Sequence, residues 1–224
     1  MNTNSLSRLG FLALLLAALV VPAVAAPGQT TLPLCFGKSA TIVGDADDGF
    51  IRGTNGDDVI LVRHTDAFVK GKGGADRICG GQLSDDLSGG RGPDRIEGGG
   101  NEADDLSGGR GNDILRSPSD QLRGGGGADK LIGGKGGEIL GNGGNDRLKA
   151  EDGGHFITFL NGGGGNDTLQ GGNRSDDLSG RAGDDKLSGG EGDDDLDGGF
   201  GDDECAGDEG VDTASNCETV SSIP

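Results

Sequence analysis

The sequence is poor in the residues that build a conventional hydrophobic core. Among its 224 residues it has no Trp, no Tyr, one Met and seven Phe, whereas Gly occurs 50 times. A chain of this composition cannot bury the apolar area of an ordinary globular domain, and its composition alone is typical of disorder. Any ordered structure must therefore depend on a regularity other than a large apolar core.

Positive charge and histidine are also scarce. The 19 Lys and Arg residues stand against 38 Asp and Glu, which gives a formal net charge of −19. This balance excludes nucleic acid and anionic membranes as partners and favours cations. His64 and His155 are the only histidines, and neither has a second His or a Cys at ligand spacing, which argues against a transition-metal site. The motifs HExxH and GxSxG are absent, so we predict that the chain is not an enzyme.

Only one long apolar run occurs, from Leu9 to Val24. Arg8 precedes it and Ala25 closes it, which is the pattern of a secretory signal peptide spanning residues 1–25. A membrane anchor is the alternative, but the run is shorter than the roughly 20 residues that a span needs. We therefore predict a secreted protein with no membrane span after signal removal. Without Arg8, the mature chain has 18 cations and 38 anions, a net charge of −20.

A nine-residue repeat organises residues 44–215. Written GGxGxDxUx, with U a large apolar residue, it is complete in the units that begin at Gly89, Gly108, Gly124, Gly162 and Gly189. Glycines permit a tight loop, and the last three residues, xUx, form a minimal strand with U on one face. One such strand buries nothing by itself, but stacked copies place each U on the next and form a narrow apolar ladder.

This repeat resembles the RTX family, the hemolysin-type calcium-binding repeats, over essentially the whole mature sequence. The resemblance implies an all-β fold, a right-handed parallel β-roll with two nonapeptides per turn. In that family, calcium ions lie between loops on the same edge of successive turns, and the sixth-position Asp and loop carbonyls are the ligands. We expect residues 26–43 to form an N-terminal lead-in and cap, residues 44–215 the roll, and residues 216–224 a C-terminal cap.

Alternate units then belong to opposite edges of the roll. The units beginning at residues 53, 71, 89, 108, 124, 141, 162, 180 and 198 keep Gly at the first and fourth positions and Asp at the sixth, and we call their side the strong edge. The intervening units form the weak edge. Each of them lacks the fourth-position Gly or the sixth-position Asp, except the units that begin at residues 189 and 207, which have both. Gly49, Ala67, Glu138 and His155 are expected in place of the weak-edge Asp.

The resemblance implies eleven aspartate ligands for multiple Ca²⁺ ions. They are Asp58, Asp76, Asp94, Asp113, Asp129, Asp146, Asp167, Asp185 and Asp203 on the strong edge, and Asp194 and Asp212 on the weak edge. The gaps between these loops would hold about nine ions, which nearly cancel the charge of the mature chain. Since stacked aspartates repel one another, folding is expected to be coupled to calcium binding. A solvated acidic repeat that binds calcium only loosely is the alternative.

The seventh position of the repeat separates charge by edge. Strong-edge units carry Arg77, Arg95, Lys130, Arg147 and Lys186 there, and weak-edge units carry Asp86, Asp105, Asp177 and Asp195. One sheet would thus bear a basic ladder and the other an acidic one. This arrangement favours self-association or a cell-surface partner, although duplicated, solvated surface charge explains it equally. We interpret the chain as an extracellular scaffold or matrix component; an adhesin and a remnant of an RTX enzyme or toxin are the alternatives.

Four cysteines lie near the two ends of the repeat array, and disulfides persist in a chain that is exported. Three connectivities exist for four cysteines. We favour Cys35 with Cys79 and Cys205 with Cys217, because each pair lies at one end of the array and the ends of a solenoid need caps. Free or differently paired thiols remain the alternative.

Overall fold

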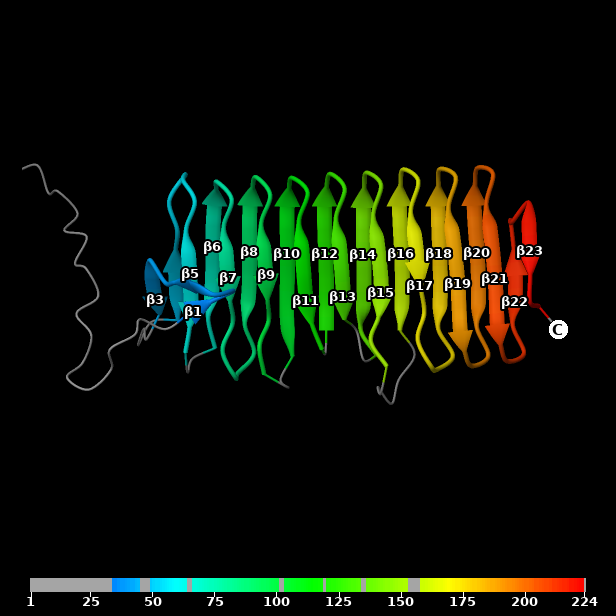
Figure 1. Cartoon of the computed structure of the whole chain (residues 1–224), viewed down its shortest axis with the longest axis horizontal. Helices are drawn as coiled ribbons and strands as arrows, with labels where there is room; N and C mark the ends of the chain where they lie inside the picture. Colours follow the sequence, from blue (N-terminus) through cyan, green and yellow to red (C-terminus); the bar gives the residue numbers. More distant parts are fainter. Residues whose placement is uncertain are drawn as a thin grey trace, which may run out of the picture.

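A computed structural model of the chain describes residues 34–44, 49–63, 66–100, 103–118, 120–133, 136–152 and 158–223. These residues form a straight rod of β-strands (Figure 1), and no helix occurs among them. Accordingly, the described part of the chain contains no helix of the length and hydropathy that a membrane span requires. The predicted signal peptide, residues 1–25, lies outside the described residues.

Two parallel sheets form the long sides of the rod. The ten-stranded sheet contains β4 (Phe50–Arg52), β6 (Phe68–Gly73), β8 (Asp86–Arg91), β10 (Asp104–Arg110), β12 (Asp120–Gly126), β14 (Glu138–Gly143), β16 (Phe159–Gly164), β18 (Asp177–Ala182), β20 (Asp195–Phe200) and β22 (Thr213–Ser215). The eleven-stranded sheet contains β3 (Ile42–Gly44), β5 (Val59–Val62), β7 (Arg77–Cys79), β9 (Arg95–Glu97), β11 (Ile114–Ser117), β13 (Lys130–Gly133), β15 (Arg147–Ala150), β17 (Thr168–Gln170), β19 (Lys186–Glu191), β21 (Glu204–Glu209) and β23 (Thr219–Ser221).

The chain alternates between the two sheets, one strand at a time. Each strand therefore pairs with the second-next strand of the sequence, and all of these pairs are parallel. The apolar U positions face one another in register, as Ile78 does with Ile96 and Leu87 with Leu106. Two nonapeptides thus make one turn of a parallel β-solenoid, which is consistent with the right-handed parallel β-roll that the sequence predicts.

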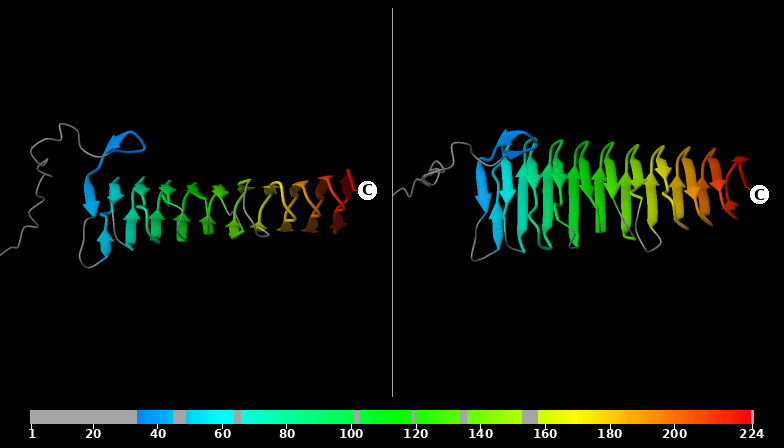
Figure 2. Two further views of the ribbon diagram at one scale, coloured as in Figure 1. Left: turned by 90° about the horizontal axis from the view of Figure 1, so that it is seen from below. Right: turned by 60° about the horizontal axis from the view of Figure 1, so that its bottom comes forward.

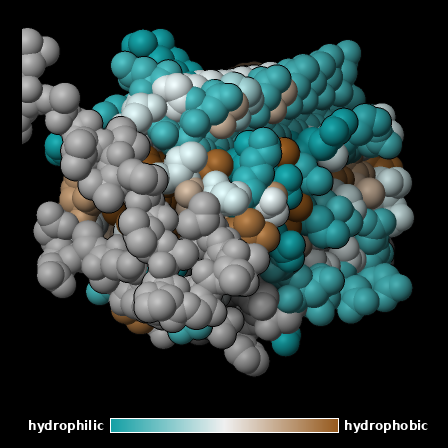
Figure 3. All heavy atoms as spheres, turned by 60° about the vertical axis from the view of Figure 1, so that its left-hand side comes forward, coloured by the Kyte–Doolittle hydropathy of each residue, from teal (hydrophilic) through white to brown (hydrophobic). Residues whose placement is uncertain are grey.

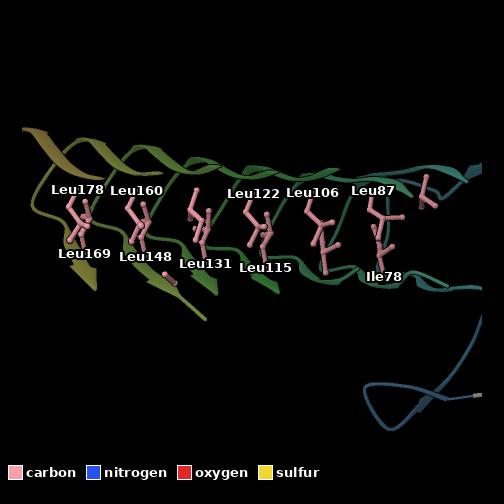
Figure 4. Close-up of a cluster of buried hydrophobic side chains, with 14 of the residues drawn as sticks. Ile78, Leu87, Leu106, Leu115, Leu122, Leu131, Leu148, Leu160, Leu169 and Leu178 are labelled. Atoms are coloured by element: carbon pink, nitrogen blue, oxygen red, sulfur yellow. The ribbon is translucent and has the colours of Figure 1, made fainter. Parts of the chain in front are cut away.

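The core is a double ladder of single side chains. Figure 4 shows leucines and isoleucines from the two sheets meeting along the axis of the rod. Leu87, Leu106, Leu115, Leu122 and Leu131 are each 0% exposed, and the ladder continues to Cys205 near the C-terminal end. With the N-terminal end turned forward, rows of hydrophilic side chains are visible along the rod in Figure 3. Complete burial of each leucine contributes roughly 1.5–3 kcal/mol, so the stability of the rod is distributed along its length.

Both ends of the rod are held by disulfides, with the predicted pairing. Cys35 bonds Cys79, and Cys205 bonds Cys217. Cys35 lies in a hairpin of β1 (Leu34–Cys35) and β2 (Lys38–Ser39), which folds over one side of the roll at its N-terminal end (Figure 2). Ile42 lies in register with Ile60, as expected for a lead-in that already follows the repeat. The first bond ties the N-terminal hairpin to β7, and the second ties the C-terminal segment to β21.

Many strands are longer than the predicted three residues. In the ten-stranded sheet, β8 continues from Asp86 to Arg91 and so includes the first two glycine positions of the following strong-edge loop. In the eleven-stranded sheet this extension appears in β19 and β21, which lead into the weak-edge loops beginning at Gly189 and Gly207. Extended strands thus enter loops that keep Gly at the first and fourth positions and Asp at the sixth, including loops without Gly at the second position, such as the one that begins at Gly71.

Two expected replacements on the weak edge were wrong. The backbone position that Asp85 and Asp176 occupy in their turns is filled by Gly137 and Thr158, whose carbonyls accept the corresponding hydrogen bonds. Glu138 is one residue further, at the start of β14. His155 lies outside the described residues. Insertions and deletions in these units precede the strand, so the position must be counted backwards from the apolar residue rather than forwards from the first glycine.

The fourth-position glycines generate a testable prediction. Gly127 has φ +130°, and a Cβ atom there would overlap the carbonyl oxygen of Gly111 in the preceding turn. The adjacent Gly126 has nothing within 4 Å of the same added atom. We expect Gly127→Ala to destabilise the roll by at least about 1–3 kcal/mol, and Gly126→Ala to be neutral or slightly stabilising. Thermal unfolding followed by circular dichroism measures both, and equal effects would contradict the role of the backbone conformation.

Candidate metal centre

A column of buried aspartates runs along the strong edge. All nine sixth-position aspartates from Asp58 to Asp203 are at most 7% exposed. From Asp76 onwards, the Oδ1 atom of each aspartate in this column accepts the backbone N–H of the aspartate one turn before it. The N–H of Asp76 donates to Asp94 at 2.9 Å, and the N–H of Asp94 donates to Asp113 at 2.8 Å. One carboxylate oxygen per turn is thereby used to hold successive loops together.

The second oxygen, Oδ2, is treated differently. In ten aspartates it is buried and has no hydrogen-bond partner among the described residues. These are Asp76, Asp94, Asp113, Asp129, Asp146, Asp167, Asp185 and Asp203 on the strong edge, and Asp194 and Asp212 on the weak edge. An unsatisfied buried carboxylate oxygen costs several kcal/mol, so a row of ten demands a ligand. All ten belong to the set that the sequence predicts.

Asp58, the eleventh predicted ligand, differs from the other ten. It lies at the head of the column, but its Oδ2 accepts hydrogen bonds from the backbone N–H of Thr54 at 2.6 Å and from the Thr54 hydroxyl at 3.0 Å. Thr54 occupies the second position of the unit, where most strong-edge units have Gly. The first loop therefore satisfies its own carboxylate, and the column of free oxygens begins at Asp76.

Three weak-edge aspartates that the sequence did not single out as ligands are also buried. Asp85, Asp104 and Asp176 are each 3% exposed and occupy the sixth position of degenerate units. Their Oδ2 atoms accept hydrogen bonds from the Gly81 N–H, the Ser117 hydroxyl and the Gly172 N–H, respectively. Burial alone therefore does not distinguish a candidate ligand from a structural aspartate; the state of Oδ2 does.

The backbone conformation of the second residue of the loop differs between units with a free Oδ2 and units in which that residue donates to Oδ2. In the ten units with a free Oδ2, the second residue has positive φ, as Gly90 does at +114°. Four of these residues are not glycine: Lys72, Asn142, Arg181 and Asp208 have φ between +73° and +84°. In the units of Asp58, Asp85 and Asp176 the second residue is not left-handed, and its N–H donates to Oδ2. Left-handed backbone is costly for non-glycine residues, and here it leaves Oδ2 without that donor.

Backbone carbonyls lie beside the free oxygens. A Cβ atom added to Gly71 would overlap Oδ2 of Asp76 and approach the carbonyl oxygen of Gly89, in the next turn, to 2.5 Å. The same arrangement recurs at Gly180, between Oδ2 of Asp185 and the carbonyl of Gly198. The first glycine of each loop is thus required by close approach, and each gap between turns offers a carboxylate oxygen and a carbonyl oxygen.

The donors in these gaps are oxygens only. Nowhere in the described ranges do three His, Cys, Asp or Glu side chains converge on a single point. A transition-metal site built from imidazole or thiolate is therefore not supported, whereas a shell of carboxylate and carbonyl oxygens suits the hard cation Ca²⁺. The residues present fit calcium.

The free carboxylates are electrostatically strained. Burial raises the pKa of Asp94 and of Asp167 to about 7, and that of Asp113, Asp146 and Asp194 to about 6. In each case the hydrogen bond from the preceding turn opposes the rise, and a neighbouring aspartate of the same column adds to it. A bound cation would offset both the desolvation and the repulsion between neighbouring aspartates, because it gives each buried carboxylate a positive partner.

Residue Glu218 was not predicted as part of the site. Its Oε2 accepts the backbone N–H of Asp203 at 2.8 Å, which is the hydrogen bond that an aspartate makes elsewhere in the column. The segment around it contains no repeat, and no spacing rule identifies it. Only the close approach of the C-terminal cap to the last turn brings Glu218 to this position.

The comparison with known families agrees with this geometry. The profile of the RTX calcium-binding nonapeptide repeat matches residues 80–115, 119–137, 138–154, 158–187, 170–205 and 179–214, together more than half of the chain. A search of curated proteins finds no match. The N-terminal units before residue 80 lie outside the matches, yet their strands continue the same two sheets in register.

The raised pKa values predict how pH affects the metal-free protein. An aspartate whose pKa is raised in the folded state binds more protons there than when unfolded. Its contribution to stability is full below about pH 4 and is lost as pH rises through 6 to 7. We therefore expect metal-free protein to gain β-structure when the pH falls from 8 to 5, as measured by circular dichroism. A double variant Asp94→Asn, Asp167→Asn should show less pH dependence; a metal-free spectrum that is unchanged between pH 5 and 8 would count against this explanation.

Proposed function

Because the chain belongs to the family of RTX calcium-binding nonapeptide repeats, we propose that it is a secreted, non-catalytic calcium-binding β-roll that folds on Ca²⁺ binding. The observation that carries the proposal is the row of ten buried, unpartnered Oδ2 atoms. Eight of them lie on the strong edge, at the equivalent position of successive turns. They therefore form a column of candidate ion positions rather than one isolated site.

The first part of the proposal concerns which residues hold calcium. Oδ2 of each of the ten aspartates, with carbonyl oxygens of the glycine loops, would contribute to the oxygen shell. Asp58 joins the column only as a donor: its backbone N–H donates to Oδ1 of Asp76 at 2.9 Å, whereas its own Oδ2 accepts hydrogen bonds from Thr54. We therefore assign the ion positions to the gaps between successive repeat loops, beginning with the gap that follows Asp76.

Calcium would supply charge neutralisation, and the chain supplies the rest. The glycine loops bring carbonyls close to the carboxylates, the Oδ1 hydrogen bonds set the height of each aspartate, and the apolar ladder keeps successive loops in register. Without cations, the column combines desolvation with repulsion between neighbouring carboxylates. Binding and folding are therefore thermodynamically linked, as in other small domains whose site exists only in the folded state.

Secretion and a scaffold role are supported by three features. The N-terminal sequence has the signal-peptide pattern, two disulfides join cysteines at the ends of the rod, and modest calcium sites fill at the millimolar calcium of extracellular fluids. The repeats occupy residues 44–215, which leaves little of the given sequence for another domain. A calcium-stiffened rod of this kind suits a surface or matrix component.

The two outer faces of the rod supply a candidate mode of assembly. Arg77 lies in register with Arg95, and Lys130 with Arg147, on the eleven-stranded sheet. Asp86 lies in register with Asp105, and Asp177 with Asp195, on the ten-stranded sheet. Both rows repeat at the strand spacing of about 4.8 Å, so the basic face of one rod matches the acidic face of another. Because this contact joins two different faces, each rod keeps one free face of each kind for a further rod. The contact therefore does not close on itself and would extend into stacks.

A calcium titration followed by circular dichroism tests the proposed function. We expect metal-free protein at neutral pH to be largely disordered and to gain β-structure cooperatively on addition of Ca²⁺, with Mg²⁺ far less effective because it prefers rigid octahedral geometry. A spectrum that is already rich in β-structure after exhaustive chelation, and that calcium does not change, would contradict the proposal.

Two adjacent aspartates provide a matched pair for the same titration. Asp185 is buried with a free Oδ2, whereas Asp184 is exposed at the fifth position, where other units carry Asn. Asp185→Asn and Asp184→Asn change the net charge equally. We expect the first to lower calcium affinity at least tenfold and the second to leave it within about twofold, since one loses a ligand and the other a solvated charge. Equal effects would mean that calcium responds to overall charge alone.

Sedimentation velocity tests the assembly. In saturating calcium, we expect concentration-dependent association at low ionic strength that disappears at about 0.5 M salt, where exposed charges are screened beyond a few ångströms. Charge reversal at Lys130 and Arg147 to Glu should abolish association and leave calcium-induced folding intact. A monomer at every salt and protein concentration would refute the stacking of charged faces.

A further inference from the structure

The C-terminal end of the strong edge is open to a ligand in a way that the N-terminal end is not. Asp203, the last aspartate of the column, is 1% exposed, and its Oδ2 has no partner among the described residues. No further GGxGxD loop follows it on this edge. At the other end, Thr54 satisfies the carboxylate of Asp58. The free oxygen of Asp203 therefore faces the C-terminal cap.

The cap places oxygen atoms where the next loop would have them. A Cβ atom added to Gly198 would overlap the carbonyl oxygen of Asn216 and lie 2.7 Å from Oδ2 of Asp203. In the preceding turn, a Cβ atom added to Gly180 meets the carbonyl oxygen of Gly198 and Oδ2 of Asp185 in the same way. The Asn216 carbonyl thus replaces the carbonyl of a first-position glycine.

Glu218 replaces the missing aspartate. Its Oε2 accepts the N–H of Asp203 at 2.8 Å, just as Oδ1 of Asp203 accepts the N–H of Asp185 at 2.8 Å. The backbone continues in step, because the N–H of Thr219 donates to the carbonyl of Asp203 and β23 pairs with β21. The longer Glu side chain reaches the column from a loop of only three residues, 216–218, between β22 and β23.

The weak edge ends differently, which shows that polar closure is specific to the strong edge. Its last aspartate, Asp212, also has a buried free Oδ2, but a Cβ atom added to Gly207 meets the Cδ1 atom of Ile223 at 2.7 Å instead of a carbonyl oxygen of a following turn. A methyl group covers one edge, and a carbonyl with a carboxylate covers the other. On the strong edge the cap therefore adds oxygen ligands for a cation to those of the last loop, whereas on the weak edge it adds none.

The Cys205–Cys217 disulfide lies at this closure. Cys205 is fully buried in the apolar ladder, and Cys217 stands between Asn216 and Glu218. The bond therefore anchors the three-residue loop to the turn whose aspartate it faces. It restricts the positions that Asn216 and Glu218 can take before any ion binds, which lowers the entropy lost on binding.

We propose that residues 216–218 complete a calcium site against the loop that begins at Gly198. Its ligands on this chain are the carboxylates of Asp203 and Glu218 and the carbonyl of Asn216. The proposal rests on the proposed calcium binding of the roll and adds to it one site that no pair of repeat loops forms. Calcium at this position ties the cap to the last turn, so the open end of the solenoid is closed by an ion as well as by a disulfide.

Native mass spectrometry of calcium-saturated protein, with calorimetric titration, tests the site. We expect Glu218→Gln to bind one calcium ion fewer than the unmodified chain, because the neutral amide keeps an acceptor for the Asp203 N–H but removes the charge. Glu209→Gln is the control. Glu209 is exposed at the end of the strand that follows Asp203, and its variant has the same net charge as Glu218→Gln. An unchanged ion count in Glu218→Gln, with the control also unchanged, overturns the proposal.

A second variant tests the contribution of the disulfide. Cys205→Val with Cys217→Ser keeps an apolar residue in the ladder and releases the loop. We expect the site at the cap to weaken at least tenfold, while the ions between repeat loops remain; an undiminished affinity for the full complement of ions would contradict the anchoring role. If the unmodified chain binds no calcium at all, the proposed function fails. If it binds calcium and Glu218→Gln binds as many ions, only the site at the cap fails.

Discussion

The structure depends on how each sixth-position carboxylate divides its two oxygens. Oδ1 accepts a backbone N–H from the preceding turn, so the aspartates form a continuous polar ladder parallel to the apolar one. Oδ2 is left buried without a donor in the ten loops whose second residue is left-handed and whose aspartate no other side chain contacts by a hydrogen bond. The same side chain thus stabilises the stacking of turns and creates an electrostatic demand that the protein atoms around it do not meet.

Backbone strain and carboxylate burial are coupled in these loops. A left-handed second residue accompanies a free Oδ2, and four side-chain-bearing residues, including Lys72 and Arg181, adopt this conformation despite its cost. In the units of Asp85 and Asp176 the second residue is not left-handed, and its N–H donates a hydrogen bond to Oδ2 of the aspartate. The two loop types differ by a few backbone torsions, yet one offers an oxygen to a cation and the other does not. Calcium affinity in this fold is therefore a property of loop conformation as much as of acidic composition.

The apolar ladder and the polar column make unequal contributions. Each turn buries two aliphatic side chains, which is little for the area of backbone that must be ordered. The column adds hydrogen bonds between turns but carries the penalty of desolvated carboxylates, seen in the raised pKa values of Asp94 and Asp167. A cation converts this penalty into attraction. The marginal apolar core explains why such a rod needs caps and disulfides at its ends, where one neighbour is missing.

The period of nine determined the main features of the fold in advance. Because stacked turns repeat the same contacts, the apolar position predicted the ladder through Leu87 and Leu106, the sixth position predicted the aspartate column, and the ends of the array predicted both disulfides. Where the period slips, counting forwards misplaced Glu138, and Gly137 occupies the sixth position of that weak-edge unit instead.

Tertiary structure alone decided which aspartates keep a free oxygen. Thr54 donates to Oδ2 of Asp58, so this oxygen is not free, and the hydroxyl of Ser117, at the end of β11, donates to Oδ2 of Asp104. It also brought Glu218 to the end of the column, although no motif surrounds that residue. The physical reason is that repetition specifies contacts between equivalent positions of successive turns. It does not specify the φ of a second residue, a hydroxyl donated from elsewhere or the fold of a cap, since each of these depends on neighbours that occur only once.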